Sequence, residues 1–191
     1  MMDAKFKQNG FTLIELLIVV TIIGILATIA IPLLNKYRIN GFNSSAVSDV
    51  HNLRTVQESL FVEYQRYGAT AVGNVPGPGL AAGVTVIGPG TGVVSTTDTV
   101  IAPRGLIIPV GNNVAICASA IPIDFSAYNA VAKHHQGDTA YGLDTDSTSI
   151  FLYKDYPNIA TSVGYVIKPS DVPPPVMQSI EFPPAPGWAV L

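Results

Sequence analysis

The segment GDTAYGLDTDSTS has acidic and hydroxyl side chains at a spacing that could hold a metal ion. Asp144, Asp146 and Thr148 alternate along the chain, as ligands often do in calcium-binding loops. An EF-hand loop that starts at Asp144 would have a glycine at its sixth position and a glutamate at its twelfth, where this chain has Ser149 and Asp155. Asx turns between strands would explain the aspartates without a metal. We therefore expect no cofactor, with calcium as the alternative.

Other residues that often carry chemistry do not form a catalytic arrangement. His134 and His135 are adjacent, so their side chains point apart in most backbones, and we expect them in a solvated loop. Cys117 is the only cysteine and cannot form an internal disulfide, and the apolar stretch VAICASA around it predicts a buried, unreactive thiol. The sequence contains no recognisable pairing of nucleophile and base, phosphate loop or paired acids. We expect a protein that is not an enzyme.

Glu15 is the one charged residue in the apolar run FTLIELLIVVTIIGILATIAI, from Phe11 to Ile31. As a helix this run would be about 31 Å long at roughly 1.5 Å per residue, which is enough to cross a bilayer. A carboxylate inside the hydrocarbon costs roughly 2.5 to 3.5 kcal/mol on insertion scales, so an intramembrane glutamate suggests a function. The alternative is that the side chain only reaches back to the lipid headgroups.

The composition supports a membrane anchor followed by a domain. The 191 residues are 48% hydrophobic with a mean hydropathy of +0.39, and the apolar excess lies mostly near the N-terminus. Charged residues make up 12% and the net charge is −3, so we expect no nucleic acid as primary partner. The apolar run exceeds the about 7 to 15 residues of a signal peptide core and lacks a good cleavage site. Lys5 and Lys7 favour a cytoplasmic N-terminus, although Lys36 and Arg38 weaken the asymmetry.

Beyond the span, apolar residues recur at steps of three and four, the period of a helix with one apolar face. They are Ala46, Val50, Leu53, Val56, Leu60, Tyr64 and Tyr67. The pattern predicts an amphipathic helix that continues over residues 32–67. Its expected polar face carries Asp49, Arg54, Glu58, Glu63 and Arg66, and Arg54 and Glu58 are spaced to pair along the helix.

The remaining residues, 68–191, predict a β-rich head. The composition changes at Gly68 to glycine, proline, valine and threonine. Short β-branched runs bounded by turn residues follow, namely VTVI, TVIA, LIIPV, NVAICA, SIFLYK and SVGYVI. They predict an antiparallel sheet on which the amphipathic helix packs, hence an α+β fold. The proline-rich tail is expected to be an extended strand or a mobile end.

Gly10 and the residues FTLIEL that follow it resemble the processing signature of type IV pilins and of the pseudopilins of type II secretion. In that family a prepilin peptidase of the inner membrane cuts after the glycine on the cytoplasmic side and methylates the new terminal amine. The resemblance implies that residues 1–10 are a leader, that cleavage falls between Gly10 and Phe11, and that Phe11 is N-methylated. It also implies the pilin fold, a long helix packed on an antiparallel head. The two cysteines that usually close a C-terminal loop in this family are missing.

The resemblance extends through Gly24, Pro32 and Tyr37 and implies roles in filament assembly. Glu15 would pair with the Phe11 amine of a neighbouring subunit, because an unpaired carboxylate is costly in a dry helix bundle. Gly24 and Pro32 both weaken a helix, and filaments of this family loosen the corresponding segment. We expect Pro32 to end or kink the first helical stretch.

The aromatic residues of the predicted helix invite a further interpretation. They are Phe11, Tyr37, Phe42, Phe61, Tyr64 and Tyr67. The sequence is similar in detail to pilins of metal-reducing bacteria, whose filaments have been proposed to carry electrons along such rings. The alternative is that the rings are anchors of the core and of interfaces, which is their usual role.

The resemblance implies a structural subunit that is stored in the inner membrane as a single-pass protein. An assembly machine would then polymerise identical subunits into a surface filament for adhesion, motility or electron transfer. One alternative is the major pseudopilin of a type II secretion system. Another is a membrane-anchored binding protein that keeps its first ten residues.

Overall fold

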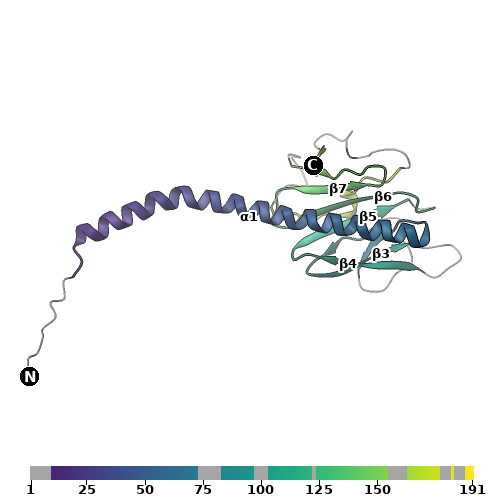
Figure 1. The fold of residues 1–191 in the computed structure, drawn as a ribbon, viewed down its shortest axis with the longest axis horizontal. Helices are drawn as coiled ribbons and strands as arrows, with labels where there is room; N and C mark the ends of the chain where they lie inside the picture. The colour runs from purple at the N-terminus through teal and green to yellow at the C-terminus, as the bar shows by residue number, and fades with distance from the viewer. Residues whose placement is uncertain are drawn as a thin grey trace, which may run out of the picture. The chain divides into compact units, whose positions relative to one another are not determined.

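The computed structural model describes residues 10–72, 83–96, 103–121, 124–154, 163–176, 182 and 188–191. The chain divides into two compact units, Met1–Arg38 and Ile39–Leu191, and we call the second unit the head. The elements are, in chain order (Figure 1), α1 (Leu13–Tyr64), β1 (Ala69–Val72), β2 (Val86–Ile87), β3 (Gly90–Thr96), β4 (Arg104–Val110), β5 (Val114–Ala120), β6 (Tyr128–His134), β7 (Ala140–Asp144), β8 (Phe151–Tyr153), the 3-10 helix η1 (Pro169–Asp171) and β9 (Trp188–Val190).

We expected Pro32 either to end or to kink the first helical stretch. Helix α1 continues through Pro32, so the first of these two outcomes is wrong. A proline removes a single N–H donor, here the usual partner of the Thr28 carbonyl, while the other bonds of the helix can still form. The hydroxyls of Thr21 and Thr28 donate to the carbonyls of Leu17 and Gly24 at 2.8 and 2.9 Å. These polar side chains of the apolar run are therefore satisfied within the helix, as lipid surroundings require.

Helix α1 ends at Tyr64, before the expected end at Tyr67. Gln65 has a φ of 56°, a left-handed conformation that terminates the helix. The backbone N–H of Tyr67 then donates to the carbonyl of Phe125 at 2.7 Å. Tyr67 therefore places its ring in the core of the head from a position outside the helix.

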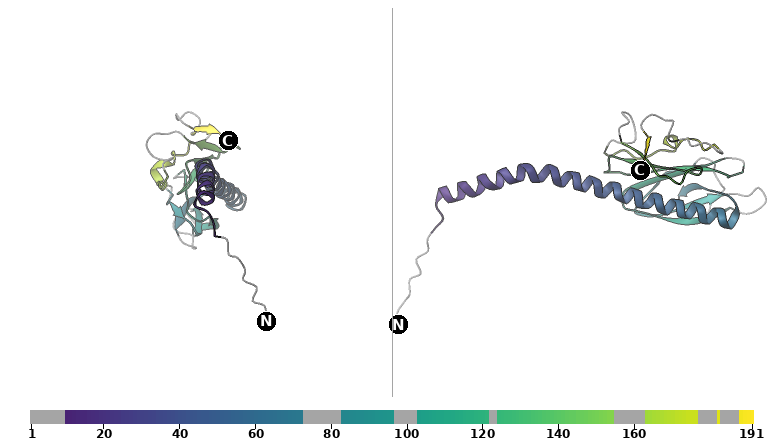
Figure 2. Two further views of the ribbon diagram at one scale, coloured as in Figure 1. Left: turned by 90° about the vertical axis from the view of Figure 1, so that its left-hand side faces the viewer. Right: turned by 45° about the horizontal axis from the view of Figure 1, so that its top comes forward.

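The strand pairs that the structure describes are all antiparallel, which confirms the α+β class. One sheet has the strand order β1-β3-β4 and the other has the order β2-β5-β6-β7-β8-β9. Strands β5 and β6 pair over their full length, from Val114 opposite His134 to Ala120 opposite Tyr128. In Figure 1 the part of α1 inside the head runs in front of the strands, with β6 and β7 above it and β3 and β4 below it, and Figure 2 gives two further views.

The predicted strand segments are confirmed in part. Strands β2, β4, β5 and β8 coincide or overlap with VTVI, LIIPV, NVAICA and SIFLYK, whereas TVIA lies outside the described residues. The prediction of a strand for SVGYVI is wrong over the described residues 163–167. Gly164 there has a φ of 94°, and the carbonyl of Ile167 accepts a hydrogen bond from the hydroxyl of Thr85 at 2.8 Å instead of a strand partner.

Strands β1, β3, β6 and β7 were not predicted. In β6 (YNAVAKH) and β7 (AYGLD), polar and charged residues interrupt the apolar ones, and all residues of both strands are buried. A strand that is covered on both faces has no alternation between apolar and polar positions. The usual period of two is therefore missing from these stretches.

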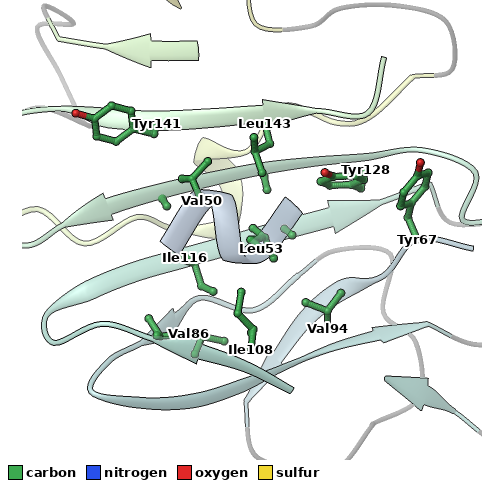
Figure 3. Packing of buried hydrophobic residues seen from close by; sticks show 14 of the residues in the cluster. Val50, Leu53, Tyr67, Val86, Val94, Ile108, Ile116, Tyr128, Tyr141 and Leu143 are labelled. Carbon is green, nitrogen blue, oxygen red and sulfur yellow. The ribbon is translucent and has the colours of Figure 1, made fainter. Parts of the chain in front are cut away.

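The first hydrophobic cluster joins α1 to the strands of both sheets (Figure 3). On the helix, Ala46, Val50, Leu53 and Leu60 are each at most 1% exposed, which confirms the predicted apolar face. Burial of a large apolar side chain contributes roughly 1.5 to 3 kcal/mol. Strand residues that complete the cluster include Val86, Val94, Ile108, Ile116, Tyr128 and Leu143.

The second hydrophobic cluster contains the side chains of β5 that alternate along the strand with those of the first cluster. Ile116 belongs to the first cluster, while its neighbours Ala115 and Cys117 belong to the second. The predicted burial of Cys117 is confirmed, and this burial raises the pKa of its thiol to about 11, which disfavours the reactive thiolate. Ile167 and Val172 also pack in this cluster.

Aromatic rings hold the C-terminal strand in place. Strand β9 pairs with β8, with Trp188 opposite Tyr153, so the tail ends in the extended strand that was one of its two expected forms. Phe182 stacks on Phe151 with ring centroids 5.6 Å apart and meets Trp188 edge-on at 4.6 Å. Gly142 lies against these rings, because a Cβ added there would be 2.6 Å from Phe182 and 2.9 Å from Trp188.

We predict that Gly142→Ala lowers the free energy of unfolding by about 1 to 3 kcal/mol, because the added methyl group overpacks the ring cluster. Thermal unfolding of the full chain in detergent micelles, followed by the fluorescence of Trp188, measures the effect. Trp188 is the only tryptophan, so the signal reports on this cluster. Gly41→Ala in α1 is the control, because no atom lies within 4 Å of its added Cβ. Equal stability of Gly142→Ala and wild type would contradict the packing described.

Candidate functional site

The predicted processing site lies just before α1. Gly10 and Phe11 are outside the helix, which begins at Leu13, and Phe11 is 92% exposed. A peptidase that cuts between the two residues would meet accessible, non-helical backbone. Residues 1–9 lie outside the described part of the chain, so the leader itself stays a prediction.

Glu15 and Thr12 form a reciprocal cap at the start of α1. The Oε2 atom of Glu15 accepts hydrogen bonds from the backbone N–H of Thr12 at 2.8 Å and from its hydroxyl at 2.7 Å. The N–H of Glu15 donates to the same hydroxyl at 3.3 Å. This capping box satisfies N–H groups that a helix start leaves unpaired. Thr12 was not predicted from the sequence as part of the site, although a threonine three residues before a glutamate, at the start of an apolar run, is the signature of the motif.

The cap gives Glu15 a partner within its own chain. A negative charge is also favoured at the N-terminal end of a helix, where the backbone dipoles are positive. Pairing with the Phe11 amine of a neighbouring subunit would have to compete with or add to these hydrogen bonds. That role of Glu15 stays a prediction.

The apolar surface of α1 between Phe11 and Tyr37 is uncovered. Leu13 is 81% exposed and Ile29 is 68% exposed, and Tyr37 is 64% exposed at the far end. Within the described residues, α1 is the one helix that is long and apolar enough to cross a membrane. An uncovered apolar surface of this extent needs lipid or an apolar partner. Gly24 and Pro32 lie inside this stretch, and their loosening in a filament stays a prediction.

Four polar side chains of α1 form hydrogen bonds with the connections between elements of the head, and we call them the turn anchors. They are Asn43, Asp49, Arg54 and Gln57. The side-chain amide of Asn43 donates to Oδ1 of Asp138 at 2.6 Å and accepts from the Asp138 backbone N–H at 3.2 Å, in the β6–β7 turn. Oδ2 of Asp49 accepts from the backbone N–H of Gly111 at 2.7 Å, in the β4–β5 turn. Burial is the main cause that raises the pKa of the Asp49 carboxyl.

The other two turn anchors bind the backbone at further connections. Nε2 of Gln57 donates to the carbonyl of Gly68 at 2.7 Å, and its Oε1 accepts from the N–H of Gly68 at 2.9 Å. The expected place of Asp49 on the polar outer face is wrong, because Asp49 is 6% exposed. Arg54 is half-buried, and its guanidinium binds the β7–β8 turn. Backbone N–H and C=O groups in a turn have no partner on a neighbouring strand, so they need other polar partners when they are buried. The turn anchors supply these partners.

Arg54 binds the backbone of the turn that follows Asp144 and Asp146, two of the candidate calcium ligands. Its guanidinium donates to the carbonyl oxygens of Thr148 at 2.6 Å, Ser149 at 2.8 Å and Ser147 at 3.5 Å. Carbonyl oxygens are typical calcium ligands, and here they converge on a cationic side chain. Arg54 therefore does not serve mainly as a partner for Glu58 along the helix, as the sequence suggested.

The candidate calcium ligands lie at the end of β7 and in the turn that follows. Asp144 is 2% exposed, and its Oδ1 accepts a hydrogen bond from the backbone N–H of Asp146 at 2.8 Å. This is the geometry of an Asx turn, the alternative explanation of the spacing. Among the described residues, no group of three or more His, Cys, Asp or Glu side chains is placed to hold a metal. The expectation of no cofactor, with calcium as the alternative, stays a prediction.

The expectation of a solvated loop is wrong for His134. The residue ends β6 and is 4% exposed, and its ring stacks on Phe42 of α1 at 4.5 Å with an interplanar angle of 11°. Its Nδ1 accepts from the N–H of Gln136 at 3.0 Å, and burial is the main cause that lowers its pKa. His135 is exposed, so the two side chains do diverge. The continuation of β6 through His134 brings the ring under the helix.

The aromatic residues of the head contact one another within the subunit. Phe61 stacks on Tyr67 at 4.7 Å, and Tyr67 contacts Tyr128 at 4.9 Å. The guanidinium of Arg104 lies 5.9 Å from the ring centre of Tyr64. These rings serve as core and surface anchors in the isolated chain, and Tyr67 is not on the helix as expected. Conduction between subunits stays a prediction.

Comparisons with known proteins match part of the chain. The family model "Prokaryotic N-terminal methylation motif" matches residues 5–31. "Type IV major pilin protein PilA" of Myxococcus xanthus (strain DK1622) is 47% identical over 72 residues, which cover 37% of this chain and 33% of that protein. A "Fimbrial protein" of Pseudomonas aeruginosa is 55% identical over 56 residues, or 29% of this chain and 36% of that protein. "Type II secretion system core protein G" of Pectobacterium carotovorum subsp. carotovorum is 32% identical over 71 residues, or 37% of this chain and 46% of that protein.

The chain thus spans about a third to less than half of the length of these relatives. No solved structure matches the chain significantly. The motif, the apolar helix and the antiparallel head together define a protein with an N-terminal methylation motif and the α+β architecture of a pilin. Part of the chain is similar to type IV major pilins and fimbrial proteins and, at lower identity, to a secretion core protein, which confirms the predicted resemblance.

We predict that Arg54→Met lowers the free energy of unfolding by about 1.5 to 3 kcal/mol, because hydrogen bonds to a charged group are lost and turn carbonyls are left without their donor.

Excess chelator should leave the melting temperature of wild type unchanged, since the arginine already supplies the cation. Both are measured by thermal unfolding of the full chain in micelles. Arg38→Met, which removes an exposed cation outside the head, is the control. A lower wild-type melting temperature in chelator would instead indicate a bound calcium ion.

Proposed function

We propose that the chain is the structural subunit of a type IV pilus. A prepilin peptidase would remove residues 1–10 and methylate the amine of Phe11. The mature protein would stay in the inner membrane as a single-pass protein until the assembly machinery extracts it into a homopolymer on the cell surface. In this role the subunit has no catalytic activity, and the filament serves adhesion or motility.

The observation that carries the proposal is the uncovered apolar surface of α1, which begins directly at the processing motif. The same helix is covered by the head further along, where Val50 and Leu53 are buried. A bilayer can cover the first part before assembly, and helices of identical subunits can cover it afterwards. The similarity to curated relatives that are named pilins or fimbrial proteins supports the same interpretation.

A second candidate is the major pseudopilin of a type II secretion system, which the similarity to core protein G favours. Both candidates predict the same processing and the same helix packing. Neighbouring genes distinguish them, because a retraction ATPase indicates a pilus and a row of minor pseudopilins indicates secretion. Electron transfer would be a refinement of the first candidate and would need ring contacts of about 4.5 to 7 Å between subunits.

We predict that the mature protein begins at an N-methylated Phe11 and that it occurs in filaments sheared from the cell surface. Mass spectrometry of the sheared fraction measures both. Gly10→Leu should block processing, since a protease site that admits glycine closely has no space for a larger side chain. A mature N-terminus at Met1 would contradict the proposal and would support a protein that keeps an uncleaved anchor.

We predict that Glu15→Leu leaves the membrane level of the subunit unchanged or higher but strongly reduces filaments. The substitution removes a carboxylate from lipid, yet it leaves the Phe11 amine unpaired in the filament, where loss of one partner of a buried pair costs about 3 to 5 kcal/mol. Immunoblots of membrane and sheared fractions measure the two pools. Thr12→Val is the matched control, because it removes the capping hydroxyl and keeps the carboxylate. Normal filaments from Glu15→Leu would show that this charge has no role in assembly.

A further inference from the structure

The charges of the first unit are separated by an uncharged stretch of helix that is as long as a bilayer core is thick. Residues 16–35 of α1 contain no charged side chain, while Glu15 precedes them and Lys36 and Arg38 follow. At about 1.5 Å per residue this stretch extends over roughly 30 Å, the thickness of the hydrocarbon core. When Glu15 lies at one edge of that core, Lys36 and Arg38 therefore lie at the other edge.

The helix is cationic at this second edge. Between Glu15 and Asp49, Lys36 and Arg38 are the only charged residues of the sequence. Both side chains are exposed, and neither makes a hydrogen bond or an ion pair with the part of the chain that the structure describes. Cations on the side opposite a cytoplasmic N-terminus are disfavoured during insertion. An anionic partner at this surface would offset that disadvantage.

The two cations point to different sides of the helix, with an aromatic ring between them. Since an α-helix has 3.6 residues per turn, Lys36 and Arg38 are roughly 160° apart around the axis. Arg38 shares a face with Leu34, which lines an uncovered apolar groove together with Tyr37. One protein surface would contact only one of these cations, whereas lipids surround a helix on all sides. The arrangement thus favours lipid over a single protein partner.

We infer that Lys36 and Arg38 bind the phosphate groups of anionic phospholipids in the periplasmic leaflet of the inner membrane. The ring of Tyr37, which is 64% exposed, lies in the same headgroup layer, where tyrosine is favoured. The groove beside Arg38 takes the first part of an acyl chain, a contact that a free phosphate ion could not make. These contacts fix the depth of the stored subunit in the bilayer. The inference rests on the part of the proposed function that places α1 in this membrane, and it does not require assembly.

Native mass spectrometry of the full chain tests the lipid preference. The protein is released from micelles that contain equal amounts of phosphatidylglycerol and phosphatidylcholine, and wild type should retain about fivefold more of the anionic lipid. Lys36→Gln with Arg38→Gln should retain both lipids equally, whereas Lys36→Arg with Arg38→Lys should keep the preference because both charges remain. Lys154→Gln with Lys168→Gln is the matched control, because it removes two exposed cations of the head. Trp188 melting curves show whether each variant folds.

Fluorescence quenching in nanodiscs made of the same two lipids tests the depth. Asn40→Cys places an exposed thiol just beyond the cations for attachment of a fluorophore, and the buried Cys117 does not compete for the reagent. A nitroxide on the lipid headgroup should quench this fluorophore more strongly than a nitroxide in the middle of the acyl chain. The reverse order would place the cations inside the hydrocarbon core and would overturn the inference.

Further outcomes of the lipid measurement decide between the possible sources of phosphate. Inorganic phosphate in excess should leave the bound phosphatidylglycerol in place, because the ion cannot contact the apolar groove. Displacement by phosphate, equal retention of both lipids by wild type, or a preference that survives in the double glutamine variant would overturn the inference. Failure of wild type to form filaments in cells would instead refute the proposed function and leave the lipid preference intact.

Discussion

The face of α1 formed by Ala46, Val50, Leu53 and Leu60 is the surface on which the head is built. Side chains from both sheets meet there, since Val94 and Ile108 come from one sheet and Ile116 and Leu143 from the other. Without the helix neither sheet would have a covered inner face. The same helix is uncovered before the head begins, so one element both organises a domain and exposes an apolar surface.

Polar contacts make this packing specific. The turn anchors bind four separate connections of the head, so each turn has a defined position along the helix. Burial of an unsatisfied backbone group costs roughly 1 to 3 kcal/mol, which disfavours alternative placements of the sheets on the helix. The outward side of the helix is thereby held in a fixed relation to the head. Rings at β8 and β9 hold the C-terminus without a disulfide.

Local spacing explains which parts of the site could be predicted. The processing motif, the capping signature at Thr12 and Glu15 and the apolar run are all contiguous in the chain, although the cap was overlooked. The role of Arg54 could not be predicted, because its carbonyl partner at Thr148 is 94 residues away. The aspartates of that turn suggested a metal, while the cation that contacts the turn comes from the helix. The burial of His134 likewise could not be predicted, because the ring of Phe42 that covers it is far away in the sequence.

The sequence by itself determined the long helix, its apolar first part and the inward face of its second part, because helical periodicity is a local property. It also indicated the antiparallel strands that are bounded by turn residues, such as β4 and β5. Only the tertiary structure decided the course of β6 and β7, since strands covered on both faces show no alternation. It also decided that Asp49 is buried and Glu58 exposed on the same helix, because the N–H of Gly111 in a distant turn gives Asp49 a partner.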